Sequence, residues 1–174
     1  MQLFFILIYF IPLLFIFTYS IIQFTLIINY LQSKKKSKNY PELTEYPMVT
    51  VQLPVYNEKY VIERLLDAVI TLDYPADKLE IQVLDDSTDE TTTLIQQKID
   101  ELKSTGSKVD LQLIRRPERT GFKAGALAYG LKIAKGEFIP IFDADFVPSS
   151  DFLKKIIPHF QNEKVGVVQT RSTH

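Results

Sequence analysis

Two aspartates one residue apart, Asp143 and Asp145, follow an apolar run that begins at Phe138. Unpaired carboxylates are costly to bury, so those at the end of a buried segment are paired or bind a metal ion. If the chain is still extended there, side chains alternate with period two and both carboxylates lie on one side. Such a pair suits Mg²⁺ or Mn²⁺, which prefer oxygen ligands and share them with substrate phosphates. The alternative is an Asp-rich turn, assisted by Pro148.

A basic cluster precedes these aspartates in the chain. An apolar period over residues 122–134 predicts a helix that Gly136 ends. The cations lie just before or at the start of this helix: Arg115, Arg116, Arg119 and Lys123. Helix starts favour anions through their free amide donors and the helix dipole. A diphosphate between this cluster and a metal ion on Asp145 would interact with both the cations and the metal-binding aspartates. The alternative is that the basic cluster lies in a solvated loop.

Polar residues also follow two earlier apolar segments. Tyr56, Asn57 and Glu58 come after the first segment, and Asp85 and Asp86 after the second. The acidic pair could bind a hydroxyl group or a base of a ligand, or it could simply form a turn. Ser87 followed by Glu90 has the spacing of a capping box, which predicts that these two residues cap the next helix.

The elements that must position these residues alternate along the chain. We expect an α/β fold in which an N-terminal transmembrane helix precedes a Rossmann-like, mostly parallel sheet with helices on both faces. In such sheets ligands bind beyond the carboxyl ends of the strands. The predicted strands are 48–56, 79–87, 110–116, 137–145 and 165–171, and the predicted helices are 59–72, 90–103, 122–134 and 151–160.

The first 33 residues contain no charged side chain and are almost continuously apolar, which predicts a retained transmembrane helix over 1–33. A signal peptide would have a basic start and a shorter apolar stretch. A lysine cluster follows: Lys34, Lys35, Lys36 and Lys38. Positive charge beside a span favours the cytoplasmic side, so we expect an outside N-terminus, a basic linker over 34–47 and a cytoplasmic domain over 48–174.

Composition excludes several classes of protein. The chain has 174 residues, of which 46% are hydrophobic and 24% charged, as in globular domains. A formal net charge of -1 gives no general attraction to nucleic acid. The absence of cysteine excludes disulfides and thiolate metal sites. His159 and His174 are isolated, and no dinucleotide fingerprint follows a strand.

Five blocks in order carry a family resemblance: VQLPVYNE (51–58), VLDDSTDET (83–91), RTGFKAGAL (119–127), FDADFVP (142–148) and VVQTR (167–171). From about Tyr46 onward the chain resembles the processive family 2 glycosyltransferases. The nearest relatives are the cellulose synthase-like proteins, including the glucomannan and mannan synthases. Five blocks at family spacing are far more specific than two aspartates alone.

This resemblance implies a GT-A fold and a membrane-bound hexosyltransferase. The donor would be a nucleotide sugar, UDP-hexose or GDP-mannose, and the acceptor a growing β-linked polysaccharide. The resemblance implies that Asp143 and Asp145 hold Mg²⁺ or Mn²⁺ on the donor diphosphate. By position in the motifs, the implied donor-binding residues are Tyr56, Glu58, Asp85, Asp86, Lys123 and Asp143.

The chain departs from the family pattern near its end. The family has a later acidic residue that acts as general base, and a later Q-x-x-R-W segment at the acceptor site. We therefore expect the base beyond His174, and we expect this chain to be a truncated donor-binding half that is inactive alone. The alternatives are a nucleotide-binding fragment without catalysis, a sugar nucleotidyltransferase, which should have a glycine-rich first loop, and a receiver-like signalling module, which shares the acidic pair at 85–86.

Overall fold

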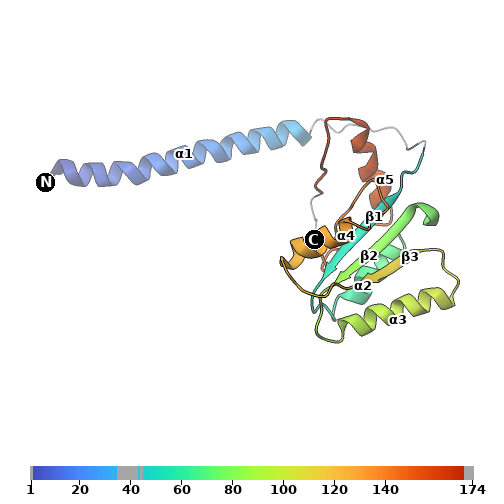
Figure 1. Cartoon of the computed structure of the whole chain (residues 1–174). Coiled ribbons are helices and arrows are strands. Elements are labelled where there is room, and N and C mark those ends of the chain that lie inside the picture. The colour runs from blue at the N-terminus through green and yellow to red at the C-terminus, as the bar shows by residue number, and fades with distance from the viewer. Residues whose placement is uncertain (1, 35–42, 44, 171–174) are drawn as a thin grey trace. The chain divides into compact units, whose positions relative to one another are not determined.

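The computed structural model describes residues 2–34, 43 and 45–170, and the chain divides into two units, 1–40 and 41–174. The first unit contains helix α1 (Gln2–Lys34), and the second contains the sheet and the remaining helices (Figure 1). The α/β fold predicted for the second unit is confirmed.

Helix α1 is long and apolar enough to cross a bilayer. The qualifying stretch, Ile8–Gln32, has a mean hydropathy of 2.1. Its hydroxyl groups donate to carbonyl oxygens one turn earlier: Thr18 to Leu14, Ser20 to Ile16 and Thr25 to Ile21, at 2.8–2.9 Å. Polar side chains satisfied within the helix are compatible with an apolar surrounding. The side chains of the lysine cluster, Lys34 to Lys38, lie outside the described residues.

Three parallel strands form the sheet, in the order β1 (Val49–Val55), β2 (Leu79–Asp85) and β3 (Asp110–Ile114). Val49 pairs with Leu79, and Glu80 with Asp110. The first three predicted strands are therefore confirmed within a residue or two of their ends. Because all three run in the same direction, their carboxyl ends lie at one edge of the sheet.

The fourth predicted strand, 137–145, is not a regular strand. Residues 137–142 run beside β1 and form only two isolated parallel bridges, Val49 to Phe138 and Gln52 to Ile141. Pro140 lies between the bridges and has no backbone N–H to continue the ladder. The chain then turns, with the Phe146 amide donating to the Asp143 carbonyl at 2.9 Å.

The last predicted strand, 165–171, is wrong over its described part. Residues 165–170 have no regular secondary structure and pair with none of the described strands. A strand needs a partner for its backbone donors and acceptors, so an apolar β-branched run alone does not make one. Residue 171 lies outside the described part of the chain.

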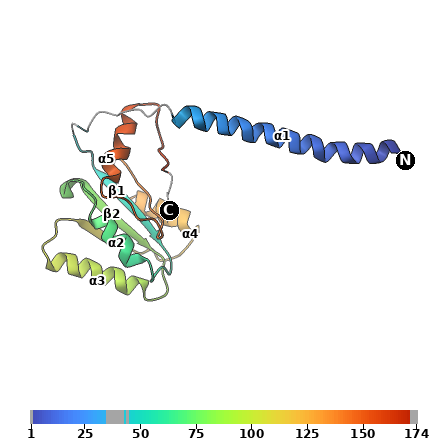
Figure 2. The same ribbon diagram turned by 180° about the vertical axis from the view of Figure 1, so that it is seen from behind.

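Helices cover the sheet on both faces, as Figures 1 and 2 show. Within the described part of the second unit the α-helices are α2 (Ile62–Ile70), α3 (Thr91–Ser104), α4 (Phe122–Leu131) and α5 (Phe152–Ile156), and the 3₁₀ turns are η1 (Ala76–Lys78) and η2 (Ile157–Gln161). The predicted helix over 151–160 is thus split into α5 and η2, because Pro158 cannot donate an α-helical hydrogen bond.

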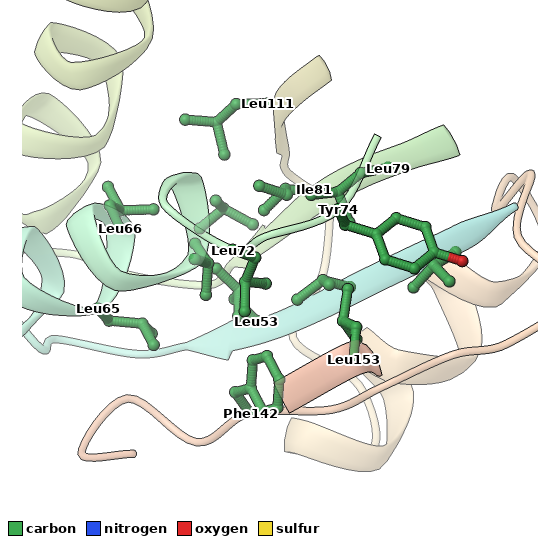
Figure 3. Packing of buried hydrophobic residues seen from close by; sticks show 14 of the residues in the cluster. Leu53, Leu65, Leu66, Leu72, Tyr74, Leu79, Ile81, Leu111, Phe142 and Leu153 are labelled. Atoms are coloured by element: carbon green, nitrogen blue, oxygen red, sulfur yellow. The ribbon is translucent and has the colours of Figure 1, made fainter. Parts of the chain in front are cut away.

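The apolar face of the sheet lies against α2 and α3. Alternate residues of β1 and β2, such as Leu53 and Ile81, are fully buried with Leu65 and Leu66 of α2 (Figure 3). The same cluster includes Phe142, from the segment beside β1. The core therefore fixes the segment that leads directly into Asp143 and Asp145.

The opposite face carries a buried polar network beneath α4 and the segment after it. Glu80 is fully buried, and its carboxylate accepts hydrogen bonds from the Thr50 hydroxyl at 2.6 Å and the Lys135 amide at 3.1 Å. The Lys135 ammonium lies 3.3 Å from the same carboxylate. Thr50 in turn accepts from the Gly136 amide at 2.8 Å. The carboxylate is tolerated in the interior because it is paired and hydrogen-bonded.

Tyr74 supplies a pH-dependent contribution to stability. Burial, with a smaller effect from Tyr46, raises the pKa of its hydroxyl to about 12, above the ordinary value of 10.0. A raised folded-state pKa gives stability that is complete below about pH 10 and is lost as the pH rises through about 12. The hydroxyl also donates to the Pro47 carbonyl at 2.7 Å.

We expect Tyr74→Phe to lower the free energy of unfolding at pH 7 by about 1 kcal/mol, because the Pro47 carbonyl loses its donor. Between pH 10 and 12 the variant should lose less stability than the wild type does. Urea unfolding of both chains across this range measures the difference. Parallel pH curves for the two chains would contradict the assignment.

Candidate donor-binding site

A cavity of about 540 Å³ opens at the carboxyl edge of the sheet. It collects residues that are far apart in the sequence from the loops after β1, β2 and β3 and from the segment after Ile141. The charged and aromatic residues that line it are Tyr56, Glu58, Asp86, Arg119, Lys123, Asp143 and Asp145. The structure therefore brings together every predicted donor and metal residue except Asp85.

The first loop is fixed to the second by Asn57. This residue has a left-handed backbone with φ of 57°, which asparagine tolerates better than most residues. Its amide donates to the Ser87 hydroxyl at 2.9 Å, and its side-chain oxygen accepts from the Thr88 amide at 2.9 Å. These bonds hold Tyr56 and Glu58, on either side of Asn57, at the cavity wall.

The predicted capping box at Ser87 and Glu90 is wrong. Helix α3 begins at Thr91, and neither side chain caps it. The Ser87 hydroxyl instead accepts the Asn57 amide, while the Asp89 carboxylate accepts the Thr91 amide at 3.0 Å. The spacing matches a capping box, but the Ser87 hydroxyl is used in the hydrogen bond that joins the loop after β1 to the loop after β2.

The two adjacent aspartates have different surroundings. Asp85 is 1% exposed, and its carboxylate accepts from the Ser87 amide at 2.9 Å and from the Thr92 hydroxyl at 2.6 Å. It lies outside the cavity lining and shapes the turn. Asp86 lines the cavity, so of the two alternatives for contact with a ligand the geometry favours Asp86.

Arg116 is a buried organiser of the third loop. Its guanidinium donates to both carboxylate oxygens of Asp86, at 2.8 and 2.6 Å, and to the Phe122 carbonyl at 2.8 Å. Hydrogen bonding to Asp86 raises the pKa of Arg116 above its ordinary value. A Cβ atom at Gly125 would lie 2.0 Å from the Thr120 carbonyl oxygen and 2.5 Å from this guanidinium, so only glycine fits there. Sequence analysis placed Arg116 among the anion-binding cations, but the structure uses it to hold the loop.

Lys123 and Asp143 form an ion pair across the cavity, and both side chains are more than half exposed. Asp145 is exposed and has no ion pair or hydrogen bond with the described residues. The predicted extended geometry is wrong here, because Asp143 to Phe146 form a turn. Both carboxylates nevertheless line one cavity, which the turn achieves without the period of a strand.

The fit of a divalent metal ion rests on the donor set. Among the described residues no group of three or more acidic, histidine or cysteine side chains forms a ready metal cage. Two accessible carboxylates beside cations suit an ion that takes its other ligands from phosphate and water, as Mg²⁺ commonly does. The residues present therefore fit Mg²⁺ or Mn²⁺ bound together with a diphosphate.

The buried network around Glu80 was missed in the sequence analysis. Its signal was available: Thr50 and Gln52 alternate with valine and leucine in β1, and Glu80 and Gln82 alternate in β2. Period-two polar residues predict a second, polar face of each strand. The sequence pattern did not show that this polar face is buried. It is buried by α4 and Lys135, which pack over it and follow Glu80 by more than 40 residues in the chain.

The fold is similar to that of two solved structures. The mannosyltransferase PcManGT from Pyrobaculum calidifontis, in complex with GDP-Man and Mn²⁺, matches with a TM-score of 0.67 and 35% identity, over 80% of this chain and 41% of that chain. S. aureus TarS 1-349 in complex with UDP-GlcNAc matches with a TM-score of 0.55 and 25% identity, over 70% and 37% of the two chains. Fold and site together define a GT-A-type glycosyltransferase domain.

Residues 50–174 match the family described as "Glycosyl transferase family 2", and the chain belongs to that family. Two relatives from Oryza sativa subsp. japonica are named probable glucomannan 4-beta-mannosyltransferases. Number 11 is 43% identical over 130 residues, and number 2 is 44% identical over 132 residues. These matches cover 72% and 73% of this chain but only 23% and 22% of the relatives. The predicted resemblance to the glucomannan synthase-like branch is confirmed.

Proposed function

We propose that this chain binds the nucleotide-sugar donor in a hexosyltransferase that extends a β-linked polysaccharide. The observation that carries the proposal is the cavity at the carboxyl edge of the sheet, where an aromatic ring, acidic groups and cations meet. Nucleotide sugars have a planar base, hydroxyl groups and a diphosphate, and the cavity offers a partner for each. The relatives and the solved neighbour PcManGT are named as mannosyltransferases, which favours a glycosyltransferase over a sugar nucleotidyltransferase or a receiver-like signalling module.

In this proposal the roles follow the geometry. Tyr56 and Glu58 contact the nucleoside, and Asp86 accepts a hydrogen bond from the base or ribose. Lys123 leaves Asp143 and pairs with the diphosphate, since its side chain is exposed and lies at the start of α4. Asp143 and Asp145 hold Mg²⁺ or Mn²⁺. When bound, the metal ion stabilises the negative charge that develops on the departing nucleoside diphosphate.

GDP-mannose is the donor that the relatives favour over UDP-hexose. Two plant relatives are named mannosyltransferases, and the solved neighbour with the higher TM-score holds GDP-Man. The neighbour TarS holds UDP-GlcNAc, so the fold itself accepts both kinds of base. The growing glucomannan or mannan would be the acceptor.

Helix α1 would anchor this domain to a membrane. Its apolar stretch is long enough to span a bilayer. Lys34, Lys35, Lys36 and Lys38 follow it in the sequence and favour a cytoplasmic domain with an outside N-terminus. A cytoplasmic domain would have direct access to nucleotide sugars.

Calorimetry on the detergent-solubilised full chain tests the proposal. We expect GDP to bind in the presence of Mn²⁺, with UDP binding at least about tenfold more weakly. Circular dichroism first establishes that the chain is folded. Selective binding of UDP would replace the proposed donor, and binding of neither nucleotide by the folded chain would contradict a donor site in this chain.

A further inference from the structure

The Arg119 side chain lies over the ring of Tyr56, which lines the cavity. Its guanidinium carbon is 3.3 Å from the centroid of the Tyr56 ring. The Phe122 ring lies on the same guanidinium at 5.1 Å, and the Asp86 carboxylate is 3.9 Å from the Arg119 Nε atom. A planar cation therefore covers one face of Tyr56.

The backbone that presents Arg119 and Phe122 is itself unusual. Gly121 and Phe122 both have positive φ, 69° and 49°. Glycine adopts this conformation freely, but a bulky aromatic residue does so only when its surroundings impose it. Phe122 is 66% exposed beside the cavity, and Arg116 holds its carbonyl. The loop therefore keeps an exposed ring next to Arg119 at the expense of backbone strain.

We propose that Arg119 is a nucleotide-positioning residue that occupies the nucleobase position on Tyr56 until the donor binds. In this proposal the base replaces the guanidinium on the ring, and the freed guanidinium donates hydrogen bonds to the diphosphate. The inference rests on the proposed function, because it requires that the cavity receives a nucleotide.

The exchange is favourable for each partner. A base stacked on an aromatic ring interacts more strongly than an exposed cation does with the same ring. Arg119 is 38% exposed and linked to Asp86 only at 3.9 Å, whereas Arg116 already makes two close bonds to that carboxylate. Arg119 can therefore leave without exposing an unpaired buried charge. A guanidinium also matches phosphate oxygens through paired N–H donors.

The test separates the base from the diphosphate. Guanosine without metal is titrated by saturation-transfer NMR, and GDP with Mn²⁺ by calorimetry, on the detergent-solubilised full chain. We expect Arg119→Ala to bind guanosine about two- to fivefold more tightly, because the competing cation has gone. The same variant should bind GDP about tenfold more weakly, because a charged donor to phosphate is missing.

Two further variants complete the design. Arg119→Lys keeps the positive charge but loses the planar guanidinium. It should therefore bind guanosine more tightly than wild type does, and it should retain more affinity for GDP than Arg119→Ala does. Arg64→Ala removes an exposed arginine of α2, outside the cavity lining, and should match wild type for both ligands.

The role of Arg119 would be overturned if the wild type binds GDP but Arg119→Ala binds guanosine no more tightly, or GDP no more weakly, than the wild type does. That result would leave the proposed function intact. Wild type that binds neither guanosine nor GDP would overturn the proposed function itself. The two failures are therefore distinct.

Discussion

Replacing Asp145 with alanine should abolish metal-dependent nucleotide binding while leaving the fold unchanged. Asp145 is exposed and has no ion pair or hydrogen bond with the described residues, so its loss removes no structural contact. It lines the cavity beside Asp143, which is already paired with Lys123. Of the two carboxylates, Asp145 is thus the one with free oxygens for a cation.

We expect the affinity for GDP in the presence of Mn²⁺ to fall at least about 100-fold in Asp145→Ala, since even outer-shell changes cost 10- to 100-fold in metal affinity. Asp145→Asn, which keeps the shape and removes the charge, should show most of this loss. Calorimetry measures the affinity, and far-UV circular dichroism checks the fold. The control is Asp77→Ala, an exposed acidic residue in η1 outside the cavity lining. Unaltered affinity in Asp145→Ala would refute the metal site.

The largest effect on stability is expected for Gly136→Ala. A Cβ atom at this position would lie 2.2 Å from the backbone nitrogen of Thr50 and 2.7 Å from the carbonyl carbon of Val49. These are backbone atoms of β1, which lies between β2 and the bridged segment 137–142, so they cannot move aside as a side chain can. Residue 136 must therefore shift, which breaks its 2.8 Å hydrogen bond to the Thr50 hydroxyl and disturbs the pairing of buried Glu80.

We expect Gly136→Ala to lower the free energy of unfolding by about 2–4 kcal/mol, at or above the usual range for overpacking. Thermal unfolding monitored by the near-ultraviolet circular dichroism of the tyrosines measures the change in Tm. Gly166→Ala is the matched control, because nothing lies within 4 Å of a Cβ atom there. Equal Tm values for the two variants would show that the segment relaxes and that the close approach is not required.

Gly136→Ala should also weaken nucleotide binding. The segment that follows it runs along β1 and delivers Asp143 and Asp145 to the cavity. A shift at its beginning is transmitted through a short, hydrogen-bonded stretch whose Phe142 is anchored in the core. Stability and site geometry thus depend on the same close approach.

Local pattern in the sequence was sufficient for the main features of the fold. The helical period of α2, the β-branched runs of β1 and β2, and the uncharged stretch of α1 predicted elements that the structure contains. Alternation of strand and helix predicted a parallel sheet, and that arrangement predicted the edge at which Tyr56, Asp86 and Lys123 meet. These predictions succeeded because each depends on periodicity or on a general rule of topology.

Tertiary contacts decided what local pattern left open. Asp85 and Asp86 are equivalent in sequence, but only the structure shows that Ser87 and Thr92 occupy the first and that the second faces the cavity. Arg116 and Arg119 belong to one basic cluster, yet one is buried on Asp86 and the other lies on Tyr56. Hydrogen-bond partners from distant loops set these differences, and no local spacing encodes them.

The sequence by itself determined the order of strands and helices from β1 to α4, the family and the edge of the sheet that holds the site, because these follow from periodic burial and ordered motifs. The tertiary structure decided which polar group at that edge is free for a ligand, because each buried polar atom must first satisfy its own hydrogen bonds. It also replaced the expected strand at 137–145 with a bridged segment and a turn. The missing N–H of Pro140 and the bond from Phe146 to Asp143 give the physical reason.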